Sequence, residues 1–124
     1  MAALFAVGWR NTGRMIRTTK DRRPNPTEAE YLGLMRSDVS DEAAKFLWDT
    51  ASRDLGPQLT LHPDDHLTED LPLDPDNVRL DWPREFAKLH GFDEAQQPDW
   101  PEDWPLTVRK YGQWLDLGLR AGQS

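Results

Sequence analysis

Apolar residues recur at helical spacing in two segments of the first half of the chain. Residues 28–35 follow Thr27, a residue type that caps helix starts, and carry apolar side chains three and four positions apart. Residues 40–55 repeat the pattern more clearly, and Gly56-Pro57 follows as a stop signal. The predicted buried face of this second helix consists of Ala43, Phe46, Leu47, Ala51 and Leu55.

Two further helices are predicted in the second half. Trp82-Pro83 suits a first helical turn, because proline already has the required φ, and this helix should run through His90 and end at Gly91. The final helix should be capped by Thr107. Its apolar stripe is Val108, Tyr111, Leu115 and Leu119, with Trp114 alongside, and the predicted core residues of the preceding helix are Phe86 and Leu89.

The segment from Pro57 to Asp81 has neither the period of a strand nor that of a long helix. It is rich in proline and acid, so we expect a long connector. Its leucines are the expected contacts with the core, namely Leu59, Leu61, Leu67, Leu71 and Leu73. The pattern as a whole predicts an all-α fold, a small helical bundle with a long first loop.

Charge divides the chain into two parts. Residues 1–23 contain six basic residues and one acidic residue, whereas the remaining residues contain nine basic and 21 acidic ones. We therefore predict a basic N-terminal arm and linker at residues 1–26 and an acidic helical domain at residues 27–124. Pro24-Asn25-Pro26 should break any helix and begin a linker, which can hold the acidic body away from a surface that the arm binds.

The arm has the composition of a segment that lies on a membrane surface. An apolar run ends at Trp9, and Arg10, Arg14 and Arg17 follow at helical spacing. The run is much shorter than the roughly 20 residues of a membrane span. Two interpretations stay open: contact of residues 1–23 with an anionic membrane, and a tail with a structural role. The acidic body repels nucleic acid, so no nucleic-acid partner is expected.

The sequence contains no cysteine, and this limits the kinds of site that the chain can form. The absence excludes disulfides, thiolate metal sites and cysteine nucleophiles, and it permits a cytoplasmic location. We expect that location, with peripheral membrane contact as an extension. No phosphate-binding glycine loop or nucleophile elbow occurs in the sequence.

One phrase points to a known family. Thr68-Glu-Asp-Leu-Pro-Leu-Asp-Pro-Asp76 resembles the motif of the acyl carrier proteins, in which leucines and acids lead into the second helix. In those proteins the motif ends in a serine whose hydroxyl carries phosphopantetheine. The chain is more similar still to small bacterial carrier-like families of unknown function that lack this serine.

Two departures from the carrier motif decide what the resemblance implies. Pro72 stands where the family has glycine, and Pro75 stands where it has the modified serine. Proline has no hydroxyl, so the arm cannot be attached there and no cofactor is expected. The resemblance implies a non-catalytic domain that binds proteins with basic surfaces through acids near the second helix. The matching positions are Asp70, Asp74, Asp76, Asp81 and Glu85, which could equally form a solvated acidic face.

A competing hypothesis is a small metal-dependent hydrolase. The loop His62-Pro-Asp-Asp-His66 places two imidazoles and two carboxylates, Asp64 and Asp65, within five residues, and both groups are zinc ligands. The phrase is similar to one in zinc-dependent sugar deacetylases, but that family needs a further histidine motif and a glutamate at the place of His66. We therefore expect turn and cap hydrogen bonds in this loop instead of a metal.

Overall fold

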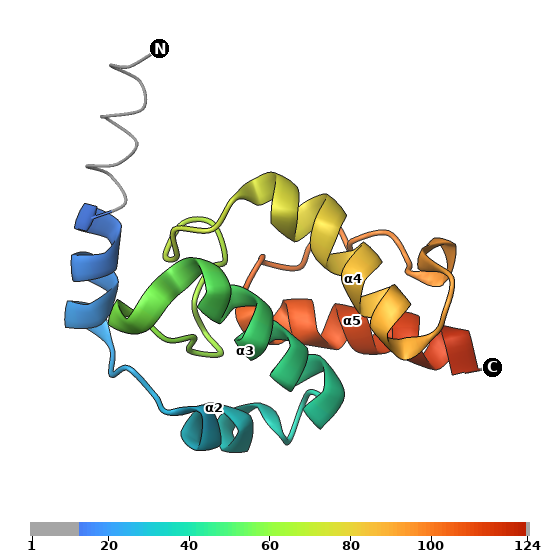
Figure 1. Cartoon of the computed structure of the whole chain (residues 1–124), viewed down its shortest axis with the longest axis horizontal. Helices are drawn as coiled ribbons and strands as arrows, with labels where there is room; N and C mark the ends of the chain where they lie inside the picture. Colours follow the sequence, from blue (N-terminus) through green and yellow to red (C-terminus); the bar gives the residue numbers. More distant parts are fainter. Residues whose placement is uncertain (1–12, 124) are drawn as a thin grey trace, which may run out of the picture.

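The computed structural model describes residues 13–123, and every regular element in this range is helical. Residues 13–22 form a first helical segment. It is followed by α2 (Glu28–Met35), α3 (Asp41–Leu55), the short η1 (Gly56–Gln58), the π-helix η2 (Asn77–Asp81), α4 (Trp82–His90), η3 (Glu94–Gln96) and α5 (Val108–Gln123) (Figure 1). The predicted all-α fold is confirmed.

Both early helices have capped starts, and the predicted cap at Thr27 is confirmed. Thr27 and Glu30 form a reciprocal capping box, in which each side chain accepts the backbone N–H of the other residue. Ser40 caps α3 by accepting the N–H of Ala43. The Asp116 carboxylate of α5 in turn accepts the N–H of Ser40 at 2.8 Å and its hydroxyl. The start of α3 is therefore tied to the last helix.

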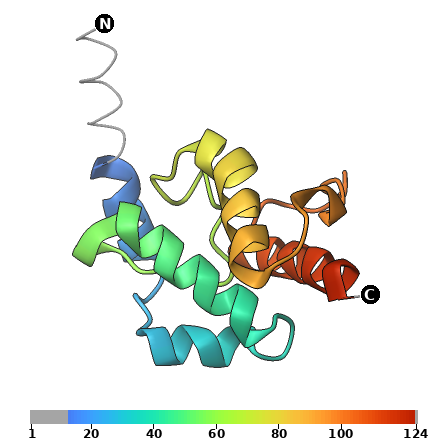
Figure 2. The same cartoon turned by 45° about the vertical axis from the view of Figure 1, so that its right-hand side comes forward.

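The core lies where α3, α4 and α5 pack together, with α2 against α3 (Figures 1 and 2). The predicted apolar face of α3 is buried throughout. Aromatic rings join the helices: Phe46 meets Phe86 at 5.1 Å between centroids, and Trp82 meets Tyr111 at 5.8 Å. All three helices thus contribute rings to one cluster.

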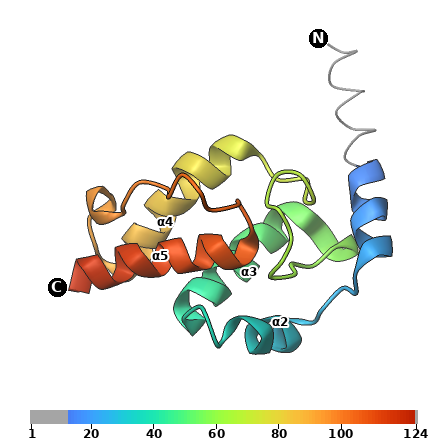
Figure 3. The same ribbon diagram turned by 180° about the vertical axis from the view of Figure 1, so that it is seen from behind.

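The long connector is held by its leucines and by the start of α5. All five predicted contact leucines are buried, none more than 6% exposed. Backbone bonds of 2.9 Å join the connector to the residues that open α5: Leu67 N–H to Leu106 O, Val108 N–H to Asp65 O and Arg109 N–H to Pro63 O. Viewed from behind, the loop lies beside the first turn of α5 (Figure 3). The connector therefore belongs to the packed body.

The backbone before α4 is also helical, which the sequence pattern did not predict. Helical geometry begins at residue 75 and continues through η2 into α4. Asp74 starts it by accepting the N–H of Asp76 at 2.8 Å. In the π-helix the N–H of Trp82 bonds to Asn77 O, five residues back. The next residue, Pro83, has no N–H, so the carbonyl of Val78 lacks a partner within this register. The hydroxyl of Tyr111 supplies it, at 2.6 Å.

One predicted core residue of α4 is not in the core. Phe86 is fully buried, but Leu89 is 68% exposed. The buried stripe of α4 consists of Trp82, Pro83, Phe86 and Ala87. It continues toward His90, whose ring packs at a tilt against Phe86 with 4.5 Å between centroids. Leu89 lies beside this stripe. Gly91, with φ of 72° and ψ of 33°, ends the helix in the left-handed conformation that glycine tolerates best.

The N-terminal residues that the structure describes lie against the body. Thr19 is buried and donates to Asp70 O at 2.6 Å, and Arg23 pairs with Asp65 at 2.6 Å. Asn25 of the predicted linker accepts the N–H of Thr60, so this segment is bonded to the connector. The arm prediction for residues 1–12 lies outside the described residues, and the boundary at residue 26 stays a prediction. Within residues 13–123, no helix has both the length and the apolar character needed to cross a membrane.

Candidate functional site

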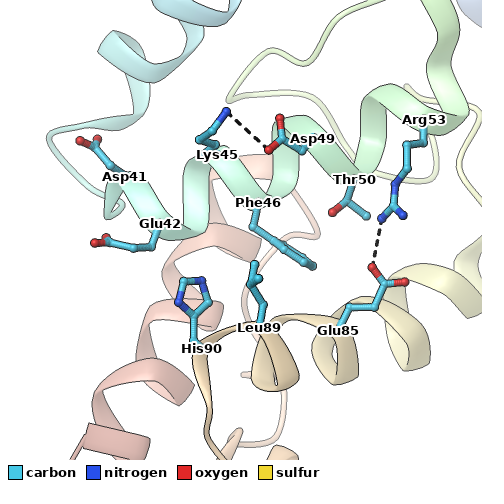
Figure 4. A pocket seen from close by; sticks show the side chains of 10 residues that line it. All are labelled: Asp41, Glu42, Lys45, Phe46, Asp49, Thr50, Arg53, Glu85, Leu89 and His90. Carbon is cyan, nitrogen blue, oxygen red and sulfur yellow. Dashed lines mark hydrogen bonds and ion pairs between the residues drawn. The ribbon is translucent and has the colours of Figure 1, made fainter.

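An open groove runs between α3 and α4 (Figure 4). Its main part has a volume of about 590 Å³, and a hollow of about 180 Å³ adjoins it through the shared residues Thr50, Arg53 and Glu85. We call the two together the α3–α4 groove. The main part is lined by Asp41, Glu42, Lys45, Phe46, Asp49, Thr50, Arg53, Glu85, Leu89 and His90, and the hollow adds Asp54, Asn77, Asp81 and Trp82.

The floor of the groove is apolar. Phe46 of α3 and Leu89 of α4 lie next to each other at its centre (Figure 4). Phe46 is 7% exposed because Phe86 supports it from below, whereas Leu89 remains largely exposed. His90 closes one end, and its Nε2 atom is buried without a hydrogen-bond partner among the described residues. An apolar side chain of another molecule placed here would remove Leu89 from water.

Both basic residues of the groove are engaged by carboxylates. Lys45 lies 3.0 Å from Glu28 and 3.5 Å from Asp49, and Arg53 lies 3.0 Å from Glu85. The hydrogen bond to Glu28 and the charge of Asp49 raise the pKa of Lys45. These pairs are exposed to solvent, so they contribute little to stability. They leave the rim with an excess of negative charge.

The acids around the groove come from both helices. Carboxylates outnumber cations six to two when the adjoining hollow is included. The six are Asp41, Glu42, Asp49, Asp54, Asp81 and Glu85. The arrangement places a line of negative charge beside an exposed apolar strip. Such a surface can bind a molecule that carries apolar and basic groups side by side.

The five acids predicted as partner-binding residues do not form one cluster. Asp81 and Glu85 line the groove. Asp74 caps the turn at residue 76, and Asp76 is exposed at the same helix start. Asp70 lies in an ion pair with Arg22 at 3.0 Å. The structure therefore brings two of the five into the candidate site.

Asp70 instead fastens the N-terminal segment to the connector. Partial burial acts to raise the pKa of this carboxyl, but the Arg22 guanidinium and the backbone N–H of His66 together lower it below its ordinary value. The N–H of His66 donates to the carboxylate at 2.7 Å. The charged form of Asp70 is thus favoured by the fold.

The His62–His66 loop is organised by hydrogen bonds. Asp65 is 1% exposed, and its carboxylate accepts the N–H of His62 and pairs with Arg23 and, at 3.7 Å, with Arg22. Nδ1 of His62 accepts the N–H of Asp64, and Nδ1 of His66 accepts that of Glu69 at 3.0 Å. In each ring, Nδ1 therefore accepts a backbone N–H of the turn that follows the histidine. Among residues 13–123, no group of three or more metal-ligating side chains is placed to hold an ion.

The α3 side of the groove was missed from the sequence, although a signal for it exists. Glu42, Lys45, Asp49 and Arg53 recur every three or four residues, so they form one charged stripe on a helix beside the apolar one. Taken alone, such a stripe is typical of a solvent-exposed helix face. Only the packing of α4 beside it shows that the stripe borders a groove.

Comparison with protein-family models, with curated proteins and with solved structures found no match to this chain. The site is therefore interpreted from its own geometry.

Proposed function

We propose that this chain is a non-catalytic, acyl-carrier-like protein-interaction domain that has no phosphopantetheine attachment and binds a partner with a basic surface. The observation that supports the proposal best is the α3–α4 groove, where six carboxylates and two already paired cations surround the apolar strip of Phe46 and Leu89. Apolar area supplies affinity, and the charge excess selects the sign of the partner and speeds the encounter.

The start of the helical segment at residue 75 supports the carrier-like part of the proposal. The resemblance places the modified serine at the beginning of the second helix, and Pro75 occupies the first helical position after the Asp74 cap. Proline is well suited to that position. It carries no group that can form a phosphodiester, so in this domain the residue starts the helix and has no part in acyl transfer.

The absence of a prosthetic group can be tested by mass. The purified protein is incubated with coenzyme A and a broad-specificity phosphopantetheinyl transferase, with a true carrier protein as the positive control. The intact mass of this chain should stay unchanged while that of the control increases. A gain equal to one phosphopantetheine would contradict the proposal and would require another hydroxyl as the attachment point.

The basic partner can be tested with an oligolysine peptide as the probe. Amide chemical shifts are followed by NMR during a titration at low salt. We expect the largest shifts at α3 and α4 residues of the groove, such as Glu42, Asp49 and Glu85, and a steep loss of binding with added salt. Shifts of equal size at all exposed acids, including Glu102 and Asp103 in the loop before α5, which do not line the groove, would contradict a dedicated site.

A further inference from the structure

We propose that the occupant of the α3–α4 groove is a basic amphipathic helix of the partner protein, an inference that rests on the proposed function. The lining residues of α3 extend from Asp41 to Asp54, about 20 Å along a helix at 1.5 Å per residue. The α4 side adds Asp81, Glu85 and Leu89, each four residues from the next. Both walls are therefore helical stripes, and a third helix of about 14 residues matches their length.

The apolar strip fixes which face of this helix points inward. Phe46 and Leu89 lie at the middle of the groove, and the charged side chains lie around them (Figure 4). Leu89 is 68% exposed, the highest value among the large apolar residues of the described chain. An incoming helix with leucine or an aromatic residue at successive turns would cover Leu89 and rest on Phe46. The centre of the contact is then apolar and its edges are polar, as in other protein interfaces.

The charges of the groove rim determine which charge the partner helix should carry beside its apolar face. Arg53 is held by Glu85, and Lys45 by Glu28 and Asp49, so neither cation is free to receive an acid of the partner. Lysine or arginine beside the apolar stripe would meet carboxylates on both walls. An acidic helix would be repelled, and the same argument excludes an anionic membrane as the occupant of this face.

The chain's own basic helical segment is already placed elsewhere. Thr19, Arg22 and Arg23 bond to Asp70 and Asp65, away from the groove. Docking of this segment into the groove of a second copy would break these contacts, including a buried ion pair. A separate partner helix requires no such loss, and it is therefore the occupant to which the proposal commits.

The experiment compares three fluorescently labelled peptides by anisotropy at low salt. The first is a lysine–leucine peptide of about 14 residues whose leucines form one helical stripe. The second has the same composition in scrambled order, and the third is oligolysine. The full chain should bind the amphipathic peptide at least about tenfold more tightly than the scrambled one, because only the first covers Leu89 while its lysines meet the rim.

Matched protein variants locate the contact. Leu89→Gln should weaken amphipathic binding about tenfold, whereas Leu80→Gln, which changes a leucine that is 54% exposed outside the groove, should change it less than about twofold. Glu85→Lys should weaken binding more than Glu102→Lys, which makes the same change of net charge at a residue that does not line the groove. All four positions are exposed, so circular dichroism should show unchanged folding.

The outcomes separate this inference from the proposed function. Equal binding of the amphipathic and scrambled peptides, with no effect of Leu89→Gln, would overturn the helix inference, and groove-localised binding of oligolysine would still support a basic partner. Absence of binding by all three peptides would overturn both. A salt-sensitive dimer in analytical ultracentrifugation that Glu85→Lys dissociates would overturn the inference in favour of a second copy as the occupant.

Discussion

Two arginine–carboxylate pairs in this molecule lie in different surroundings. Arg23 and Asp65 meet at 2.6 Å with side chains 9% and 1% exposed, and Arg53 and Glu85 meet at 3.0 Å with side chains 63% and 47% exposed. The first pair joins the N-terminal segment to the connector. The second lies on the rim of the α3–α4 groove. Burial, and not residue type, separates a pair that maintains the fold from one that is available to a partner.

The buried pair belongs to a network in which each charge is surrounded by hydrogen bonds. Arg23 donates to both carboxylate oxygens of Asp65 and to Thr60 O. Asp65 also accepts the N–H of His62, and its carbonyl accepts the N–H of Val108. The network thus links the first helical segment, the long connector and the start of α5. Removal of Asp65 would leave the Arg23 guanidinium without its carboxylate, and removal of Arg23 would leave Asp65 with only the exposed Arg22 at 3.7 Å.

The largest expected effect is that of Asp65→Asn. The substitution keeps the shape of the side chain but removes the charge that faces Arg23, so the free energy of unfolding should fall by about 3 kcal/mol or more. Urea denaturation measures the loss. Glu85→Gln, the matched change in the exposed pair, should cost less than about 1 kcal/mol. Equal losses in the two variants would show that burial does not distinguish the pairs.

The hydrogen bond from Tyr111 to Val78 O is buried and uncharged, so it tests whether burial makes a contact important for stability without charge. Tyr111→Phe removes the donor to Val78 O, which Pro83 cannot replace, and should cost about 1–3 kcal/mol through an unsatisfied buried carbonyl. In a Pro83→Ala background a backbone N–H becomes available to that carbonyl, so Tyr111→Phe should cost less there. A double-mutant cycle by urea denaturation measures this coupling. Additive effects would rule out the link between Pro83 and Tyr111.

Much of the helical framework could be predicted from the sequence because it depends on local rules. Thr27 caps α2 and Gly91 ends α4, as the sequence predicted. The leucines of the connector were predicted to be buried because an acidic, proline-rich loop has few other apolar groups to place in the core. These predictions need only the neighbouring residues.

The features that were missed depend on residues far apart in the chain. Arg23 and Asp65 are separated by 42 positions, and nothing local shows that they meet. The π-helix before α4 is stable because Tyr111, 33 residues after Val78, satisfies the freed carbonyl. Leu89 was placed in the core by its spacing from Phe86, but the buried stripe continues along the side of His90 instead. The acids of α3 border the candidate site only because α4 packs beside them.

The ion pair of Asp70 with Arg22 is more exposed than Arg23–Asp65 and less exposed than Arg53–Glu85. Its contribution to stability should depend on pH. The pKa of Asp70 is lowered in the fold, so its contribution to stability is present above the unfolded pKa of about 4 and is lost as pH falls through the lower folded value. Asp70→Asn should reduce the free energy of unfolding by about 1 kcal/mol at neutral pH. Below the folded pKa the variant and the parent should converge. Urea denaturation across the acid range tests this, and a constant difference at all pH values would assign the loss to geometry instead of charge.

The smallest expected effect on stability is at the groove rim, where a substitution that barely changes stability should strengthen the binding of a basic peptide. Arg53→Gln removes an exposed cation, so the free energy of unfolding should change by less than about 0.5 kcal/mol. Glu85 then has no arginine that competes with the peptide for its carboxylate. Oligolysine should therefore bind about two- to fivefold more tightly at low salt. Arg84→Gln is the matched control, because Arg84 is equally exposed and pairs with Glu94 outside the groove. Urea denaturation and fluorescence anisotropy give the two readouts. Equal gains in affinity for both variants would mean that net charge alone attracts the peptide, and a gain restricted to Arg53→Gln would locate the binding between α3 and α4.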